Sequence, residues 1–267
     1  MKLIEMVLIL FYSALFGGLL TVVSYRLPRM LLESTQNFNL FFPASHCPAC
    51  KAKIHWQYKL PIVGYLISRG QCYSCKSKIP LHYVLIEIFF TLLIVVLFIY
   101  YGLNWHFVFL AIFTFFATAL FLIDMRYGLL PDALVFPLAA FGLLASVYNI
   151  FVSSRQAIIG CLIGFAIAYA VAGIYQYLRG REGLAFGDVK LLAALGAWLG
   201  PWALPFILLQ ASILLLAYAG LLTLLTSRKT AKSFLRLKIA FGPFLLLGAA
   251  TLLLLNPLSP LLLLQGG

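Results

Sequence analysis

Long apolar stretches recur along this chain of 267 residues, and they constrain its fold more than any other feature. An α-helix needs roughly 20 apolar residues to cross a bilayer, because each residue advances it by about 1.5 Å. Only 10% of the residues are charged, against about 25% in a typical soluble domain. The stretches are continuously apolar rather than alternating, which argues against transmembrane strands. The sequence therefore predicts an all-α, polytopic membrane protein.

About eight of these stretches are candidates for transmembrane helices. They are residues 3–23, 83–101, 105–123, 133–151, 157–178, 189–199, 203–226 and 239–255. The shortest, 189–199, runs into Gly200 and Pro201, so we expect local thinning of the bilayer there, or a re-entrant or broken helix. The first stretch is too long for an ordinary signal-peptide core, and we expect it to be retained.

The basic residues predict how these helices are oriented. They gather in residues 24–82, 179–190 and 227–238, with Arg126 after the third stretch. By the positive-inside rule these regions are cytoplasmic and both termini lie outside. The formal net charge of +12 follows mostly from this bias and favours contact with anionic membrane lipids. Because the basic residues are scattered over several loops, we expect no nucleic-acid binding.

Four cysteines in the long polar segment 43–82 form two Cys-x-x-Cys pairs. They are Cys47, Cys50, Cys72 and Cys75. The spacer 51–71 is slightly longer than the roughly 15–20 residues usual between the pairs of a zinc site. A cytoplasmic position argues against disulfides and leaves a redox role as the alternative. We predict a structural zinc site, because four thiolates fill a tetrahedral ion's coordination positions and fold a segment too small for its own core.

Two acidic residues, Asp124 and Asp188, fall where apolar stretches meet polar loops. Ionisable groups in such places are costly and indicate function. If their helices are neighbours, the two carboxyls would share one proton, and such a pair can activate water and protonate a peptide carbonyl. The alternative is that each aspartate caps a helix or pairs with Arg126 or Lys190.

Other residues near these acids carry weaker expectations. Gly183 and Gly187 precede Asp188, and because glycine permits close approach, we expect them to form a loop along which a substrate lies. Asp132 follows a proline, which predicts an N-cap for the fourth helix. Glu87, one turn into the second stretch, is expected to pair with a basic loop residue.

Taken together, these motifs resemble those of the type IV prepilin peptidases, or prepilin leader peptidase/N-methyltransferases, a family of GxGD-type aspartic membrane proteases. The motifs are YRLP at 25–28, the CPAC and CYSC pairs, IDMRYGLLPD at 123–132, FGDVKLLAALGAWLG at 186–200 and FGPFLLLGA at 241–249. Ala185 stands where the family motif has its first glycine. Because alanine is the mildest replacement, we expect activity to be retained with a change in loop flexibility or substrate tolerance.

The resemblance implies that residues 1–267 form a single membrane-embedded protease domain of the bacterial inner membrane, with 43–82 as an inserted segment. It implies Asp124 and Asp188 as the catalytic pair. It also implies prepilin or type II secretion pseudopilin substrates, whose basic leader is cut after a glycine at the cytoplasmic face. Most members then methylate the new N-terminus with S-adenosylmethionine, and the cysteine segment is associated with that activity. The sequence has no nucleotide-binding fingerprint, so no residues are assigned to the methyl donor.

Two other functions compete with this interpretation. A proton-coupled transporter would use intramembrane acids as a relay, but the chain shows no repeated halves of the kind many transporters have. A membrane scaffold would use the zinc segment to dock a partner, and the two aspartates argue against it.

Overall fold

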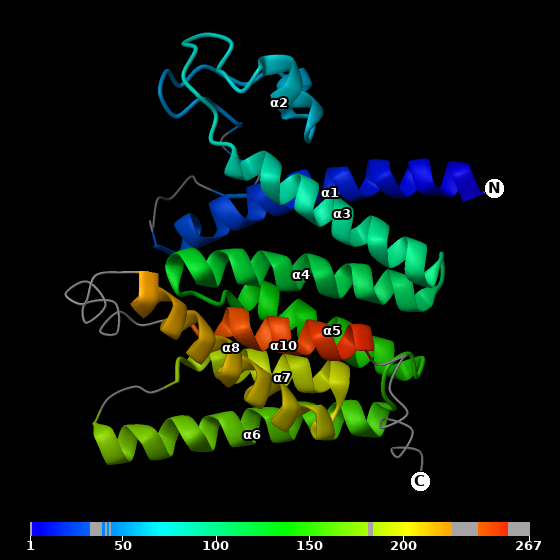
Figure 1. The fold of residues 1–267 in the computed structure, drawn as a ribbon, viewed down its shortest axis with the longest axis vertical. Coiled ribbons are helices and arrows are strands. Elements are labelled where there is room, and N and C mark those ends of the chain that lie inside the picture. The colour runs from blue at the N-terminus through cyan, green and yellow to red at the C-terminus, as the bar shows by residue number, and fades with distance from the viewer. Residues whose placement is uncertain are drawn as a thin grey trace. The chain divides into compact units, whose positions relative to one another are not determined.

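The computed structural model describes residues 2–32, 39–40, 42, 44–180, 184–225 and 240–255. Regular structure in these ranges is helical, apart from two isolated β-bridges. The chain divides into two compact units, Met1–Ala119 and Leu120–Gly267, and the boundary falls inside helix α4 (Figure 1). Gly183 and Pro43, which the sequence placed in the substrate loop and the zinc segment, lie outside the described residues.

The longer helices of the described part fall on the predicted stretches. They are α1 (Lys2–Leu32), α3 (His82–Tyr101), α4 (Trp105–Tyr127), α5 (Asp132–Val147), α6 (Ser154–Arg179), α7 (Phe186–Leu199), α8 (Leu204–Leu225) and α10 (Gly242–Leu255). Five of them, α1, α3, α4, α6 and α8 with its preceding turn η2 (Pro201–Ala203), are long and apolar enough to cross a membrane. Helices α5 and α10 are shorter and apolar. The predicted all-α, polytopic membrane fold is confirmed.

Two boundaries differ clearly from the prediction. Helix α1 continues to Leu32, nine residues beyond the predicted end at residue 23. Helix α5 ends at Val147 rather than near residue 151. Just beyond it, Asn149 adopts a left-handed backbone with φ of +51°. Asparagine tolerates this conformation better than most residues, and it breaks the helical path within an otherwise apolar stretch.

The first unit pairs α1 with α3, which lie against each other (Figure 1). A Cβ added at Gly17 of α1 would lie 3.2 Å from the Cα of Glu87 on α3, so the glycine lets the two backbones approach closely. Between these helices the chain forms a short helical pair, η1 (Trp56–Lys59) and α2 (Val63–Ser68), and two small cysteine turns.

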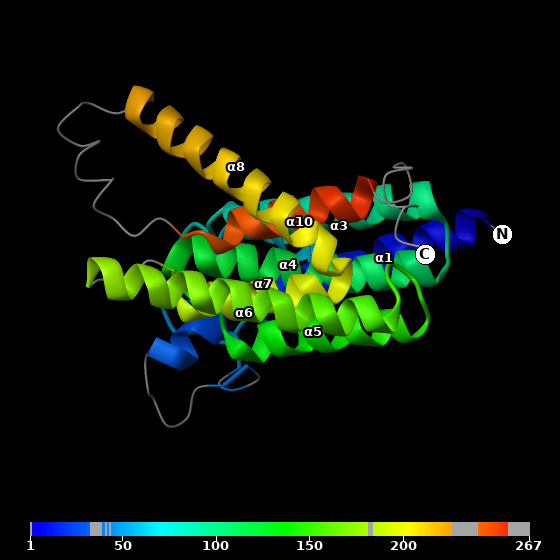
Figure 2. The same cartoon turned by 90° about the horizontal axis from the view of Figure 1, so that it is seen from below.

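The second unit is built around α7, which lies between α6 and α10 in both views (Figures 1 and 2). From Asp188 to Leu199 every side chain of α7 except Lys190 is buried. Gly160 of α6 and Gly196 of α7 cross so closely that a Cβ on either would overlap the other's carbonyl oxygen. Trp198 donates its indole N–H to the carbonyl of Leu138 on α5 at 2.8 Å. Because protein encloses α7, this helix can be shorter than the bilayer is thick.

Candidate active site and metal centre

Asp124 lies in the last turn of α4, in the second unit. The helix ends just after it, where the N–H of Gly128 donates to the carbonyl of Asp124 at 2.8 Å and Gly128 takes a left-handed φ of +62°. The side chain of Asp124 is only 4% exposed. The backbone N–H of Gly242 lies beside the carboxyl, yet among the described residues Oδ2 has no partner with hydrogen-bonding geometry. A buried carboxyl oxygen without a partner is energetically costly.

Asp188 is the third residue of α7, and the extended residue Ala185 is the N-cap. The carboxylate of Asp188 reaches back to accept the N–H of Ala185, which satisfies one of the free donors of the helix N-terminus. Ala185 has a φ of −69°, a conformation that any residue adopts. The alanine that departs from the family motif therefore introduces no backbone strain.

The two predicted catalytic side chains come together in the structure. Asp188 is 6% exposed, and the charge of Asp124 acts on its carboxyl. Both belong to the second unit, one at the end of α4 and one in the first turn of α7. An interacting pair of buried carboxyls holds a proton more readily than two separate carboxylates would.

Leu130 and Gly242 complete the surroundings of the pair, and sequence reasoning assigned neither of them a role. A Cβ added at Gly242 would lie 2.5 Å from Oδ2 of Asp124 and 3.2 Å from Cδ1 of Leu130. A Cβ added at Gly187 would lie 2.9 Å from Cβ of Leu130. Leu130 thus packs against both glycines, and each glycine is needed for close packing. The only sequence signal was the place of Leu130 in the LLPD motif and of Gly242 in the FGPF motif.

Lys190 and Arg126 have other contacts than the alternative interpretation expected, in which they pair with Asp188 and Asp124. Lys190 forms an ion pair with Asp132, at 2.7 and 2.8 Å from its two carboxylate oxygens. Arg126 lies over the ring of Tyr127, with 5.8 Å between the guanidinium carbon and the ring centroid. The predicted N-cap role of Asp132 is wrong, because Pro131 is the N-cap and Asp132 is the first residue of α5. Lys190 thus links α7 to the start of α5, and its ion pair is with Asp132 and not with Asp188.

The predicted partner of Glu87 is also wrong. Its Oε2 atom accepts the backbone N–H of Ile62 at 2.7 Å, where we expected a basic side chain. The hydroxyl of Thr21 lies near this carboxylate and donates to the carbonyl of Gly18 at 2.7 Å. In the first unit Glu87 therefore fixes the turn that precedes α2.

The four predicted metal ligands gather at one point of the first unit. Their sulfur atoms all lie within 4.8 Å of one another. Two of the separations are 3.8 Å, from Cys47 to Cys75, and 4.0 Å, from Cys50 to Cys72. A tetrahedral ion with metal–sulfur bonds of about 2.3 Å requires separations of about 3.8 Å. The cluster could hold such an ion with little rearrangement.

Two nearly identical turns build this cluster. In the first, the N–H of Cys47 donates to Ala52 at 3.0 Å, and that of Lys51 donates to Cys47 at 2.9 Å. The second repeats both bonds from Cys72 to Ser77 and from Lys76 to Cys72, at 2.9 and 3.0 Å. Lys51 and Lys76 both take left-handed backbones, with φ of +57° and +58°.

Backbone N–H groups and one hydroxyl prepare the sulfur atoms for a cation. Bonds from the amide of Cys50, the hydroxyl of Ser77 and the amide of Ala49 lower the pKa of Cys47 to about 6. The hydroxyl and amide of Ser77 lower the pKa of Cys75 as well. The amide of Ala52 also favours the thiolate of Cys50, but desolvation and the neighbouring sulfurs raise its pKa to about 11. A bound cation would favour all four thiolates at once, because it binds the deprotonated form.

Comparison with known proteins matches two successive parts of the sequence. Residues 11–101 match the model of the bacterial peptidase A24 N-terminal domain, and residues 111–220 match that of the type IV leader peptidase family. The chain is 35% identical over 228 residues to the prepilin leader peptidase/N-methyltransferase of Dichelobacter nodosus, covering 78% of this chain and 80% of that protein. The proteins of the same name from Aeromonas hydrophila and Neisseria gonorrhoeae are 36% and 34% identical. They match 89% and 86% of this chain, and 86% and 84% of their own lengths. No solved structure matches the chain.

Proposed function

Since the chain belongs to the type IV leader peptidase family, we propose that it is a membrane aspartic endopeptidase that removes the leader peptide from type IV prepilins or type II secretion pseudopilins. The name shared by its relatives includes N-methyltransferase. The same protein therefore methylates the new N-terminal residue after cleavage, with S-adenosylmethionine supplying the methyl group. No residues are assigned to that second reaction.

The observation that carries the proposal is the buried carboxyl pair of Asp124 and Asp188. A purely structural acid would have its oxygens satisfied by helix caps or basic side chains, but Oδ2 of Asp124 has no such partner among the described residues. The basic side chain closest in sequence to Asp188, Lys190, is held by Asp132. The pair is thus left free to exchange a proton with a substrate and water.

The proposed reaction needs only one shared proton and one water molecule. One aspartate, as the carboxylate, takes a proton from the water, whose oxygen then attacks the carbonyl carbon of the scissile peptide. The other aspartate gives its proton to the carbonyl oxygen, which produces a neutral tetrahedral intermediate. When the intermediate collapses, the carbon–nitrogen bond breaks and the amine nitrogen takes up the proton that the first aspartate received. One hydroxyl of the intermediate returns its proton to the second aspartate as it becomes the carbonyl of the new carboxyl group, so the pair again holds one proton. Cleavage frees the leader and a new N-terminus.

The residues around the pair would keep this geometry fixed. Leu130 packs against Gly187 and Gly242, so that the first turn of α7 and the start of α10 close on the same side chain. Pre-organised acids of this kind lower the barrier because little has to move during the reaction. We retain Gly187, together with Gly183, as a proposed part of the substrate loop.

The cysteine cluster supports a structural zinc ion held by Cys47, Cys50, Cys72 and Cys75. All four positions of a tetrahedral ion would be filled by sulfur, so the ion would organise the segment 43–82 and take no part in peptide cleavage. The donor set of four thiols favours zinc over harder cations.

We place this protease in the bacterial inner membrane, with both termini outside and with the cysteine segment and the two aspartates at the cytoplasmic side. The basic loops support this orientation. Residues 1–267 act in this proposal as one protease into which the cysteine segment is inserted. Prepilin or pseudopilin precursors and the surrounding lipids are the partners.

The test compares the wild type with Asp124→Asn and Asp188→Asn, purified in lipid with a prepilin or pseudopilin precursor, by intact mass of the product. Asparagine keeps the shape of each side chain but removes the exchangeable proton, so cleavage should fall by at least about 10²-fold in each variant. Asp132→Asn is the matched control and should cleave normally. Unchanged cleavage in either of the first two variants would falsify the paired-aspartate mechanism. An added methyl group on the wild-type product establishes the second activity.

A further inference from the structure

The short helical pair between the cysteine turns exposes an apolar surface. We call residues 56–69, which contain η1 and α2, the η1–α2 segment. Its apolar side chains at Trp56, Val63, Leu66 and Ile67 are exposed, and those of Trp56 and Leu66 are 64% and 67% accessible. The inner face is closed, because a Cβ on Gly64 would lie 2.5 Å from the carbonyl oxygen of Tyr58. The segment thus packs on itself and turns its larger apolar side chains outward.

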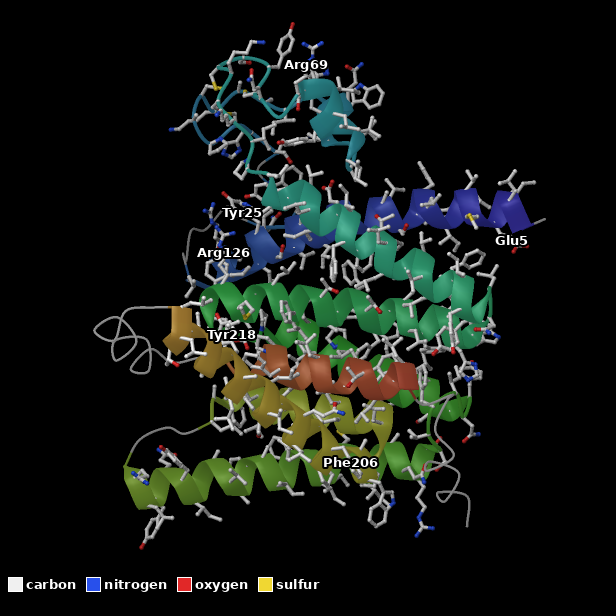
Figure 3. All side chains as sticks on the ribbon, in the orientation of Figure 1. Glu5, Tyr25, Arg69, Arg126, Phe206 and Tyr218 are labelled. Carbon is white, nitrogen blue, oxygen red and sulfur yellow. The ribbon has the colours of Figure 1, made fainter. Side chains whose placement is uncertain are left out.

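The same region carries only positive charge. Six basic residues, all exposed, lie between residues 44 and 81: Lys51, Lys53, Lys59, Arg69, Lys76 and Lys78. The chain has no acidic residue between Glu33 and Glu87. Arg69 follows the last residue of α2 directly, and its side chain extends away from the helix (Figure 3). Exposed apolar side chains next to unopposed cations are the composition of a segment that lies in a membrane interface.

Contacts inside the first unit give the depth of this segment. A Cβ on Gly18 of α1 would lie 2.6 Å from Cγ of Pro61. Gly18 lies about 23 Å along the helix from Leu3, where the apolar span of α1 begins. In a hydrocarbon layer about 30 Å thick whose outer boundary lies at Leu3, the residues touching Gly18 are about 7 Å below the inner boundary.

The contact with α3 gives the same depth independently. Glu87 accepts the N–H of Ile62 at 2.7 Å, and it lies about 8 Å along the helix from His82, where the apolar span of α3 begins. Ile62 itself has a φ of +61°, an uncommon backbone for a β-branched residue. The glutamate thus holds an unfavourable turn in place at this level of the membrane.

We propose that the η1–α2 segment is an interfacial membrane anchor. Its apolar side chains Trp56, Val63, Leu66 and Ile67 insert among the acyl chains beside α1 and α3, and its cations, Lys59 and Arg69 with the lysines of the cysteine turns, bind anionic lipid headgroups. Amphipathic segments of this type lie about 5–10 Å into the boundary between headgroups and acyl chains, which matches the depth that both contacts give. The anchor ties the metal-binding turns to the membrane surface. It depends on the insertion of α1 and α3 and not on the proposed protease activity.

Lipid fits this surface better than a protein partner does. The surface begins at a turn that already lies at membrane depth, so acyl chains are adjacent to it without any binding event. Anionic headgroups complement its uniform positive charge, and each basic residue near such a surface contributes about 1 kcal/mol. The basic leader of a substrate would be repelled by the same charges.

The test places a photo-crosslinking benzoylphenylalanine at one position at a time in the full-length protein, in nanodiscs of phosphatidylcholine with phosphatidylglycerol. Position 66 is the probe, Leu92 on the exposed face of α3 is the lipid-facing control, and Lys53 in the first cysteine turn is the polar control. The expected result is lipid adducts at position 66 in a yield comparable to that at position 92, and few at position 53. Protein adducts at position 66, or lipid adducts no more frequent than at position 53, would overturn the proposal. Unchanged metal content shows that each variant is folded.

A second measurement does not need a new side chain in α2. Brominated lipids quench tryptophan fluorescence at short range, and the signal of Trp56 is the difference between the wild type and Trp56→Phe. We expect this difference to be quenched, and more strongly with phosphatidylglycerol present than in phosphatidylcholine alone. Loss of the extra quenching in the Lys59→Gln, Arg69→Gln double variant would support the role of the two cations. A Trp56 signal that brominated lipid leaves unchanged would contradict the anchor.

Discussion

The metal cluster and the carboxyl pair are built in opposite ways. Each cysteine turn is closed by hydrogen bonds between residues at most nine apart in sequence, and two of the cluster's four cysteines, Cys50 and Cys75, are exposed. The carboxyl pair is buried and joins the end of α4 to the start of α7. Gly242, at the start of α10, packs against it from a third helix. Each turn of the first site is therefore encoded locally, and a cation as proposed would join the two turns, whereas the second site is encoded by helix packing.

The two sites are vulnerable to different changes. A locally encoded metal site unfolds when its metal ion is removed, because little buried apolar surface remains to hold the turns. A site made by packing fails when a backbone is pushed away, even by a substitution far from the acids. The two sites should therefore be separable by experiment.

Removing the metal should have the largest effect. A strong chelator added to the full-length protein takes away a stabilisation of about 10–16 kcal/mol, so residues 44–81 should lose their folded structure. Limited trypsin digestion should then cleave after Lys51, Lys53 or Lys76, while hydrogen exchange in α7 stays slow. If α7 loses its protection as well, the two sites are not independent.

Enlarging a glycine at the α6–α7 crossing should have the next largest effect. Gly196→Leu places a side chain against the backbone of Gly160, which should cost roughly 3 kcal/mol through overpacking. Thermal unfolding measures the loss, and metal content should not change. Gly173→Leu on α6 is the control, because a Cβ there meets nothing within 4 Å, and it should change stability by less than about 0.5 kcal/mol. Equal losses in both variants would contradict the crossing.

A smaller change tests the surroundings of the acids. Gly242→Ala adds a Cβ that would lie 2.5 Å from Oδ2 of Asp124, so the carboxyl must move. Displacement of a catalytic group by about 1 Å can lower the rate by about 10²-fold, and we expect cleavage to fall by about 10- to 100-fold. Gly220→Ala in α8 is open on all sides and should cleave like the wild type. Normal cleavage by Gly242→Ala would remove Gly242 from the site.

The exposed ion pair should matter least. Asp132 and Lys190 have side chains that are 52% and 21% accessible, and exposed pairs contribute only about 0.2–1 kcal/mol. A double-mutant cycle with Asp132→Asn and Lys190→Gln should therefore give a coupling energy in that range and fall with added salt. A coupling several times larger would mean that this pair, and not the packing of α7, determines the position of Asp188.

The sequence predicted the locally encoded parts of this protein from residue spacing alone. It pointed to the packed pair of Asp124 and Asp188 through the family resemblance, but it missed most of the other contacts that depend on packing. The spacing of each Cys-x-x-Cys pair predicted the cysteine cluster, because each pair and its turn lie in the same short segment. The apolar stretches predicted the helices for the same reason. The partner of Glu87 and the contact between Gly242 and Asp124 join distant parts of the chain, and no local pattern specifies them. Asp132 was misplaced because a proline took the cap position that aspartate usually occupies.

The position of Gly242 also has a consequence for the order in which the protein is made. Asp124 and Asp188 leave the ribosome well before Gly242, the glycine that packs against Oδ2 of Asp124. A nascent chain that has inserted α4 to α8 therefore carries both acids but lacks the segment that closes around them. The site is completed only when its last described helix, α10, enters the membrane. An unfinished chain would thus remain inactive toward the many other membrane segments that pass through the same insertion machinery.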